Sequence, residues 1–329
     1  MSHDKTFDVI IIGGGHAGLS AALTLYRQLH TILILDNQKP RNSWALPTHT
    51  VIGWEGRQAE ELRVTTRNEL AATDLVTFAD GEAQSIQKVQ EAFEVTDEQG
   101  RHWKCRKLLL AAGKQNIFPD IPGFEENYPA RIFHCMFTFG YENRGSKHAG
   151  LLADGALSSP FHAAMVVGDT RKFAERVTVF TNGDSALKEK MAIEIKNSGV
   201  TFDDRRLLSI QRSDSGLVLE LDGGSSQEVE FLVHQPSTKV NIPLVEQLGL
   251  ELDERGDIKN VPPFFQTSVP GVFVAGDCGS PFKIIPMAMF MGANAGAGIA
   301  RSLAADNLKN ELASTVNGTS HGTNRITVN

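Results

Sequence analysis

The chain has 329 residues, of which 41% are hydrophobic and 22% charged, and its formal net charge is −7. This composition is ordinary for a globular protein, and the length predicts two domains rather than one core. An acidic chain without a basic cluster argues against nucleic acid and anionic membranes as partners. No apolar run is long enough to predict a membrane span.

The first elements in chain order are a strand, a glycine-rich turn, a helix and a second strand. Residues 7–12 form an apolar, β-branched run, an apolar helical face follows residues 13–18, and residues 31–35 predict a buried strand that ends at Asp36. In the Gly13-x-Gly15-x-x-Gly18 pattern, the first glycine permits a tight turn, the second lets a pyrophosphate approach the backbone, and the third lets the helix pack closely. Asp36 lies eighteen residues after Gly18, close to the spacing expected for an acid that binds a ribose. The unit predicts a dinucleotide site.

The rest of the chain adds a second nucleotide-domain pattern. A helix is expected over residues 58–72 and strands over 75–112, followed by a proline-marked linker. A strand, helix and strand follow near residues 149–153, 159–173 and 177–181, then a helix near 185–197 and further strands to about 233. Residues 271–277 read as another buried strand that ends in an acid, Asp277, and residues 286–305 as a helix. A group at that strand end suits the ribityl and phosphate end of FAD, and Pro286 suits a helix start.

These motifs together resemble the low-molecular-weight thioredoxin reductase family. The match rests on residues 13–18, 111–113 and 271–277, and residues 133–145 make it similar to the fungal, gliotoxin-oxidase-like branch that oxidises dithiols in natural-product pathways. The resemblance implies an α/β fold with two Rossmann-like, three-layer domains. It implies an FAD-binding domain over residues 1–117 and 241–312, an inserted NADPH-domain-like domain over 118–240, and a homodimer. The tail, 313–329, is rich in Ser, Thr, Asn and Gly and is expected to be disordered.

The same resemblance implies which residues bind FAD. They lie in the glycine turn, after the second strand, in the loop that follows it, and near the two later strand ends. The expected set is Gly13, Gly14, Gly15, His16, Ala17, Gly18, Asp36, Asn37, Gln38, Arg41, Asn42, His49, Gly53, Ala83, Ala111, Ala112, Gly113, Gly276, Asp277, Pro286, Met287 and Ala288.

The sequence departs from this family where its redox disulfide would lie. The family's Cys-x-x-Cys, commonly followed by Asp, reads Cys135, Met136, Phe137, Thr138 and then Phe139. Threonine has no thiolate state and cannot form a disulfide, so the disulfide relay is predicted to be absent. The chain's three cysteines offer neither a disulfide framework nor a metal site, and with no secretory signal we expect a cytoplasmic protein.

The nicotinamide site departs as well. Only one glycine, Gly155, stands where a second fingerprint is expected, no arginine cluster follows the next strand, and Asp154 and Asp184 would repel a phosphate. The sequence therefore argues against NADPH as a tight partner. The fungal branch lacks these features too and uses dioxygen.

The leading hypothesis is direct oxidation of a small-molecule substrate at FAD, with dioxygen as electron acceptor. His134 is the candidate general base, and the alternative for it is a structural histidine. Thr138 is expected to contact flavin or substrate or to shape the cavity, which Phe137 and Phe139 would make more apolar unless they are core residues. Cys135 is either inert or the centre of a second hypothesis, a thiol or dithiol oxidase that acts through Cys135 or directly on the flavin. A non-redox isomerase or cyclase, or a catalytically silent flavin-binding partner, is the third.

Overall fold

The structure, a computed structural model, describes residues 6–43, 47–196 and 199–318. Two compact units make up the chain. The first unit contains Met1–Ser43, Glu60–Lys114 and Val240–Asn329, and the second contains Trp44–Ala59 and Gln115–Lys239. The predicted fold class, α/β with two Rossmann-like domains of the thioredoxin reductase plan, is confirmed.

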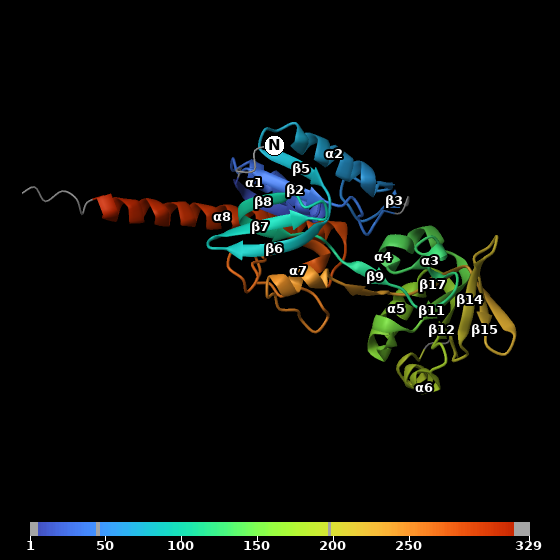
Figure 1. Cartoon of the computed structure of the whole chain (residues 1–329). Coiled ribbons are helices and arrows are strands. Elements are labelled where there is room, and N and C mark those ends of the chain that lie inside the picture. Colours follow the sequence, from blue (N-terminus) through green and yellow to red (C-terminus); the bar gives the residue numbers. More distant parts are fainter. Residues whose placement is uncertain (1–5, 44–46, 197–198, 319–329) are drawn as a thin grey trace, which may run out of the picture. The chain divides into compact units, whose positions relative to one another are not determined.

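The first unit is built on one seven-stranded sheet (Figure 1). Its β-branched central strand has Val9, Ile10 and Ile11 fully buried, as a strand covered on both faces requires. The parallel strands are β1 (Thr6–Ile12), β2 (Ile32–Asp36), β5 (Val76–Asp80), β8 (His102–Leu110) and β19 (Val272–Val274), and β6 (Ala83–Val89) and β7 (Ala92–Asp97) continue the sheet as antiparallel strands. The helices are α1 (His16–Tyr26), α2 (Ala59–Ala71), α7 (Ile242–Gln247) and α8 (Ile285–Gly318).

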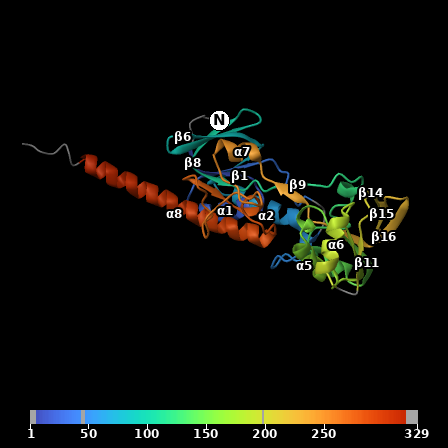
Figure 2. The same cartoon turned by 90° about the horizontal axis from the view of Figure 1, so that it is seen from below.

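Helices α1 and α8 lie side by side, which Figure 2 shows from below. Small residues allow this close approach: a Cβ on Gly292 would lie 2.1 Å from the Ala17 carbonyl oxygen, and one on Gly296 would lie 2.9 Å from that of Ala21. Helix α8 thereby packs closely against α1, the helix that follows the glycine-rich turn.

The second unit contains a five-stranded parallel sheet in the order β10-β17-β11-β12-β13. Those strands are β10 (Ile132–Phe133), β17 (Phe231–Val233), β11 (Ser146–Leu152), β12 (Ala174–Phe180) and β13 (Val200–Asp203). Its helices are α3 (Phe124–Asn127), α4 (Met136–Phe139), α5 (Pro160–Thr170) and α6 (Ser185–Glu194), with 3-10 turns η1 (Tyr141–Asn143) and η2 (Gly155–Ser158). An antiparallel sheet of β14 (Leu207–Arg212), β15 (Leu217–Leu221) and β16 (Ser225–Val229) and the pairs β9 (Gln115–Ile117) with β18 (Ser237–Lys239) and β3 (Pro47–Thr48) with β4 (Arg57–Gln58) complete it.

Two boundaries differ from the sequence prediction. The predicted first domain included residues 44–59, but the described part of this segment belongs to the second unit; His49, for example, bonds Glu55 and lies 3.9 Å from Glu142. The predicted disordered tail began at residue 313, whereas α8 continues through Gly318 (Figure 1). Good helix formers at residues 308–313 carry the helix into the Ser, Thr, Asn and Gly cluster, and it ends at a glycine, a poor helix former. The remaining tail, 319–329, lies outside the described residues.

Candidate functional site

The carboxyl ends of the five parallel strands in the first unit lie at one edge of its sheet. Ile12 is in register with Leu35 on β2 and with Leu110 on β8. The backbone ladder continues beyond the strands, since Gly13 N–H donates to the Leu35 carbonyl (2.8 Å) and Ala111 N–H to the Ile12 carbonyl (2.8 Å). Open α/β sheets bind ligands at this edge, so the geometry brings the separate glycine and acid motifs to one place.

Each glycine of the first motif meets a different constraint. Gly13 has a φ of 107°, and a Cβ there would lie 2.4 Å from the Ala111 carbonyl oxygen. A Cβ on Gly18 would lie 2.0 Å from the Gly13 carbonyl oxygen, so the turn closes only without side chains. A Cβ on Gly15 would meet nothing within 4 Å. The open space at Gly15, directly before α1, fits the close approach of a pyrophosphate to a helix N-terminus.

Asp36 lies against this loop at the end of β2. A Cβ on Gly14 would come within 2.5 Å of the Asp36 carboxylate, which places the acid directly beside the glycine turn. The Arg67 guanidinium is 3.6 Å from the same carboxylate and donates to Asp80 at 2.7 Å. This carboxylate fits the proposed role of binding a ribose hydroxyl.

Two other predicted FAD residues, far apart in the sequence, form an ion pair. Arg41 Nε donates to Asp277 Oδ2 at 2.8 Å, and both side chains are 17% exposed. Arg41 also donates to the Lys283 carbonyl oxygen at 3.4 Å. The loop after β2 is therefore fastened to the end of β19, as one long cofactor spanning both would require.

A buried charged cluster beside this pair was missed by sequence reasoning. Lys114 Nζ lies 2.6 Å from Asp257 Oδ1, with side chains 0% and 3% exposed, and Lys283 Nζ lies 3.9 Å from the same oxygen. Burial lowers the pKa of Lys283, followed in weight by the opposing attraction of Asp257. The one available signal was the position of Lys114 directly after the predicted residues 111–113.

The remaining predicted cofactor residues fall at several places. Gly276 has a φ of 77°, and a Cβ there would lie 2.9 Å from the Ala17 side chain. Pro286, Met287 and Ala288 lie in the first turn of α8. Asn42 accepts a hydrogen bond from Arg63, Ala83 is buried at the start of β6, and Gly113 follows β8. Three of the predicted residues are exposed: Asn37, Gln38 and Ala112. His49 and Gly53 belong to the second unit, and their predicted contact with FAD stays a prediction.

The candidate catalytic residues all belong to the second unit and follow β10. His134 accepts or donates a hydrogen bond at Nδ1 with the Tyr128 hydroxyl at 2.9 Å. Cys135 occupies the N-cap position of the short helix α4 without a side-chain capping bond, and Thr138 lies three residues later within the helix. His134, Cys135 and Thr138 are partly exposed.

The two aromatic residues of this segment do not act as a pair. Phe137 is 76% exposed. Phe139 stacks on Phe133 with centroids 5.0 Å apart and meets the His134 ring edge-on at 5.2 Å. Phe139 therefore packs against the core of the second unit, as the core alternative for it predicts, while Phe137 is exposed and its place beside a flavin or substrate stays a prediction.

Cys135 is the accessible cysteine. All three cysteines of the chain are free thiols. Cys105 and Cys278 are buried in the core of the first unit, and burial raises the pKa of each thiol to about 12. Neither is a reactive thiolate at neutral pH.

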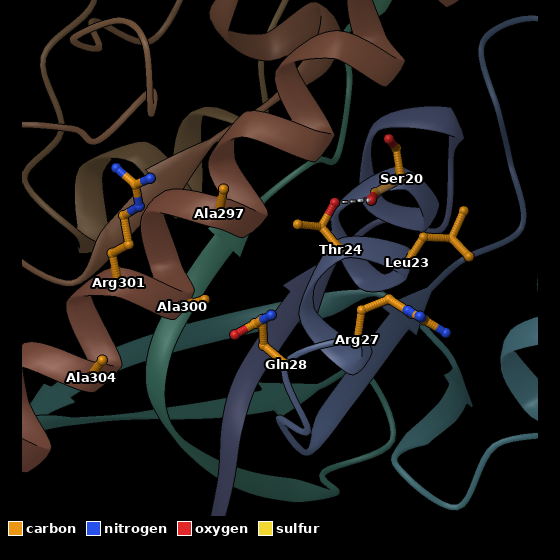
Figure 3. A pocket seen from close by; sticks show the side chains of 9 residues that line it. All are labelled: Ser20, Leu23, Thr24, Arg27, Gln28, Ala297, Ala300, Arg301 and Ala304. Carbon is orange, nitrogen blue, oxygen red and sulfur yellow. Dashed lines mark hydrogen bonds between the residues drawn. The ribbon is translucent and has the colours of Figure 1, made fainter.

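An open groove of about 720 Å³ runs between α1 and α8 (Figure 3). It is lined by Ser20, Leu23, Thr24, Arg27, Gln28, Ala297, Ala300, Arg301 and Ala304, none of which is a predicted FAD residue. Its hydroxyls bond the backbone: Thr24 donates to the Ser20 carbonyl and Ser20 to that of Met289.

Among the described residues, no group of His, Cys, Asp and Glu could hold a metal ion. Within the same ranges, no helix has the length and apolar composition of a bilayer span.

Comparison with known proteins agrees with this geometry. Residues 7–292 match the pyridine nucleotide-disulphide oxidoreductase family. The chain is 37% identical to thioredoxin reductase aclD of Aspergillus oryzae (91% of this chain, 97% of the relative) and 37% identical to thioredoxin reductase sirT of Leptosphaeria maculans (89% and 93%).

Solved structures share the fold. An oxidoreductase from Agrobacterium tumefaciens is 30% identical with a TM-score of 0.80 over 91% of this chain and 99% of the other. HlmI, at 23% identity, has a TM-score of 0.86 over 97% and 99% and supports the fold alone. The chain belongs to the pyridine nucleotide-disulphide oxidoreductase family, and is an FAD-dependent oxidoreductase similar to fungal thioredoxin reductases.

Proposed function

We propose that this protein oxidises a small molecule of fungal specialised metabolism directly at FAD, without a redox-active disulfide, and that dioxygen reoxidises the cofactor. The observation that carries the proposal is Thr138, which stands one helical turn after Cys135 where the family's second cysteine is expected. The other two cysteines are buried in the first unit. Cys135 thus has no second thiol in its own unit with which to cycle between dithiol and disulfide.

FAD supplies a two-electron acceptor, and the protein orients the substrate and moves protons. Bound FAD would accept a hydride equivalent from the substrate and would pass two electrons to dioxygen, which with two protons would leave as hydrogen peroxide. His134 would take the substrate's proton. Thr138 lies four residues after His134 and is proposed to orient the substrate or the flavin edge through its hydroxyl.

The second unit supports a source of electrons other than NADPH. The Asp154 carboxylate accepts from Gly155 N–H at 2.6 Å, and the Asp184 carboxylate accepts from Leu187 N–H at 2.8 Å at the start of α6. These backbone donors are the kind that hold phosphates in nucleotide sites. Since carboxylates of the chain itself bond them and repel phosphate, we propose that the unit has lost its nucleotide.

The test is flavin reduction without air. We expect dithionite to bleach the flavin band near about 450 nm, while NADPH and dithiothreitol leave it unchanged. Candidate substrates from the producing pathway should bleach it, and should yield hydrogen peroxide in air. If no such substrate reduces the flavin under anaerobic conditions, the proposal is wrong.

A second candidate, thiol oxidation, is favoured by the partial exposure of Cys135. A dithiol would then attack the flavin directly or form a mixed disulfide with Cys135. Rapid bleaching by dithiothreitol would replace the first proposal with this one, and loss of that bleaching in Cys135→Ala would assign it to the thiol. From the family resemblance we also propose a homodimer in the cytoplasm, which sedimentation and cell fractionation would test.

A further inference from the structure

A cluster of charged side chains in the first unit, beside the carboxyl ends of β8 and β19, carries more positive than negative charge. Its cations are Arg41, Lys114 and Lys283, and its anions are Asp257 and Asp277. Arg41 Nε donates to Asp277 Oδ2 at 2.8 Å, and Lys114 Nζ lies 2.6 Å from Asp257 Oδ1. These two close ion pairs cancel four of the charges, so the charge of Lys283 is the surplus.

Lys283 has no carboxylate to itself among the side chains that the structure describes. Its Nζ lies 3.9 Å from Asp257 Oδ1, beyond hydrogen-bond distance and on the oxygen that Lys114 already contacts. Its nearer partner is neutral, since it donates to the Ser280 carbonyl oxygen at 3.4 Å. The side chain is only 23% exposed, and burial lowers its pKa. A partly buried cation of this kind is stabilised when a further negative group comes close.

The surroundings of Lys283 are residues that are proposed to bind FAD. Arg41 donates to its carbonyl oxygen at 3.4 Å, and the charge of Asp277 acts on its ammonium group. Helix α8 begins two residues later, at Ile285, and its first turn contains Pro286–Ala288. The N-terminus of a helix carries partial positive charge, which adds to that of the lysine. The positive charge of this segment is therefore concentrated where the cofactor is proposed to bind.

We propose that Lys283 is the cation that stabilises reduced FAD and thereby raises the reduction potential of the flavin. This rests on the part of the proposed function in which FAD is the only redox centre. Reduction by two electrons and one proton leaves one negative charge on the flavin ring, and a charge of the protein near the ring tunes its electronics. Because Lys114 pairs with Asp257, the charge of Lys283 is not cancelled within the cluster.

The test is the midpoint potential of the FAD-loaded protein, measured against a reference dye during anaerobic reduction without substrate. Lys283→Met keeps the length of the side chain and removes its charge. We expect the affinity for reduced FAD, relative to oxidised FAD, to fall at least about tenfold, which lowers the potential of a two-electron couple by about 30 mV. Lys283→Arg keeps the charge and should restore most of the lost potential.

Lys259→Met is the matched control, because Lys259 lies in the same unit but is 54% exposed and pairs with Glu251. It should leave the potential unchanged. If Lys283→Met does not fold, Lys283→Gln removes the same charge and keeps a polar end. A wild-type potential in the neutral variant would overturn the proposal. Equal weakening of oxidised and reduced FAD would also overturn it, by assigning the lysine to the phosphates. No substrate enters this measurement, so failure of the proposed oxidase activity is seen separately, in the titrations with candidate substrates.

Discussion

Replacing Asp257 by Asn should strongly destabilise the first unit. Asp257→Asn keeps the shape of the side chain but removes the charge that lies 2.6 Å from Lys114 Nζ, in a pair whose side chains are 3% and 0% exposed. Breaking a buried pair on one side costs about 3–5 kcal/mol, because the remaining charge stays buried without compensation. For a unit of this size each kcal/mol lowers Tm by roughly 2–4 °C, so a fall on the order of 10 °C is expected.

The matched control is an exposed pair nearby in the sequence. Glu251→Gln removes the partner of Lys259, where the side chains are 62% and 54% exposed, and such pairs contribute about 0–1 kcal/mol. Thermal unfolding followed by circular dichroism and by the release of flavin fluorescence measures both variants. Equally small changes in Tm for Asp257→Asn and Glu251→Gln would refute the reasoning that the buried Lys114–Asp257 pair stabilises the first unit.

Three further predictions follow from single contacts. Gly15→Ala should weaken FAD binding at least about tenfold, a loss of about 1.4 kcal/mol, with little change in apoprotein stability. Gly18→Ala should instead impair folding, because its Cβ would lie 2.0 Å from a carbonyl oxygen. FAD titration and unfolding of the apoproteins measure the two effects, and equal behaviour of the variants would contradict the different roles given to Gly15 and Gly18. Burial lowers the pKa of His148 below 6.5, so the unfolded chain binds the proton more tightly and the second unit should lose stability as pH falls below about 6.5; denaturation across this range should show a steeper slope in wild type than in His148→Gln, which keeps the contribution of buried His234. Thr138→Cys should form a disulfide with Cys135, so the four thiols of the unfolded variant should fall to two on oxidation; four persistent thiols would show that α4 does not bring residues 135 and 138 together.

The sequence was sufficient to predict the dinucleotide unit because its constraints are local. The glycine spacing, the buried strand before it and Asp36 after it are all read within one strand–helix–strand segment. The register of parallel strands then places Gly13 and Ala111 side by side without further information. The position of Asp277 followed from the same rule about carboxyl ends of strands.

Long-range partners were beyond sequence reasoning. No residue near Lys114 in the sequence indicates that it pairs with Asp257. Likewise, no neighbour of Arg41 indicates that it pairs with Asp277, 236 residues away. Phe139 could equally have faced a cavity, and its stacking on Phe133 is set by tertiary packing. Helix α8 extends beyond residue 305, its predicted end, because residues with high helix propensity follow the apolar face on which the prediction was based.

The central claim, oxidation at FAD without an internal disulfide, is tested most directly by anaerobic titration with dithionite. A protein whose redox centre is the flavin alone takes up about one molecule of dithionite per FAD, since flavin and disulfide are each two-electron centres. Our account predicts this stoichiometry for wild type and the same value for Cys135→Ala. Uptake of about two molecules per FAD in wild type, falling to about one in Cys135→Ala, would reveal a second centre at Cys135 and contradict the account.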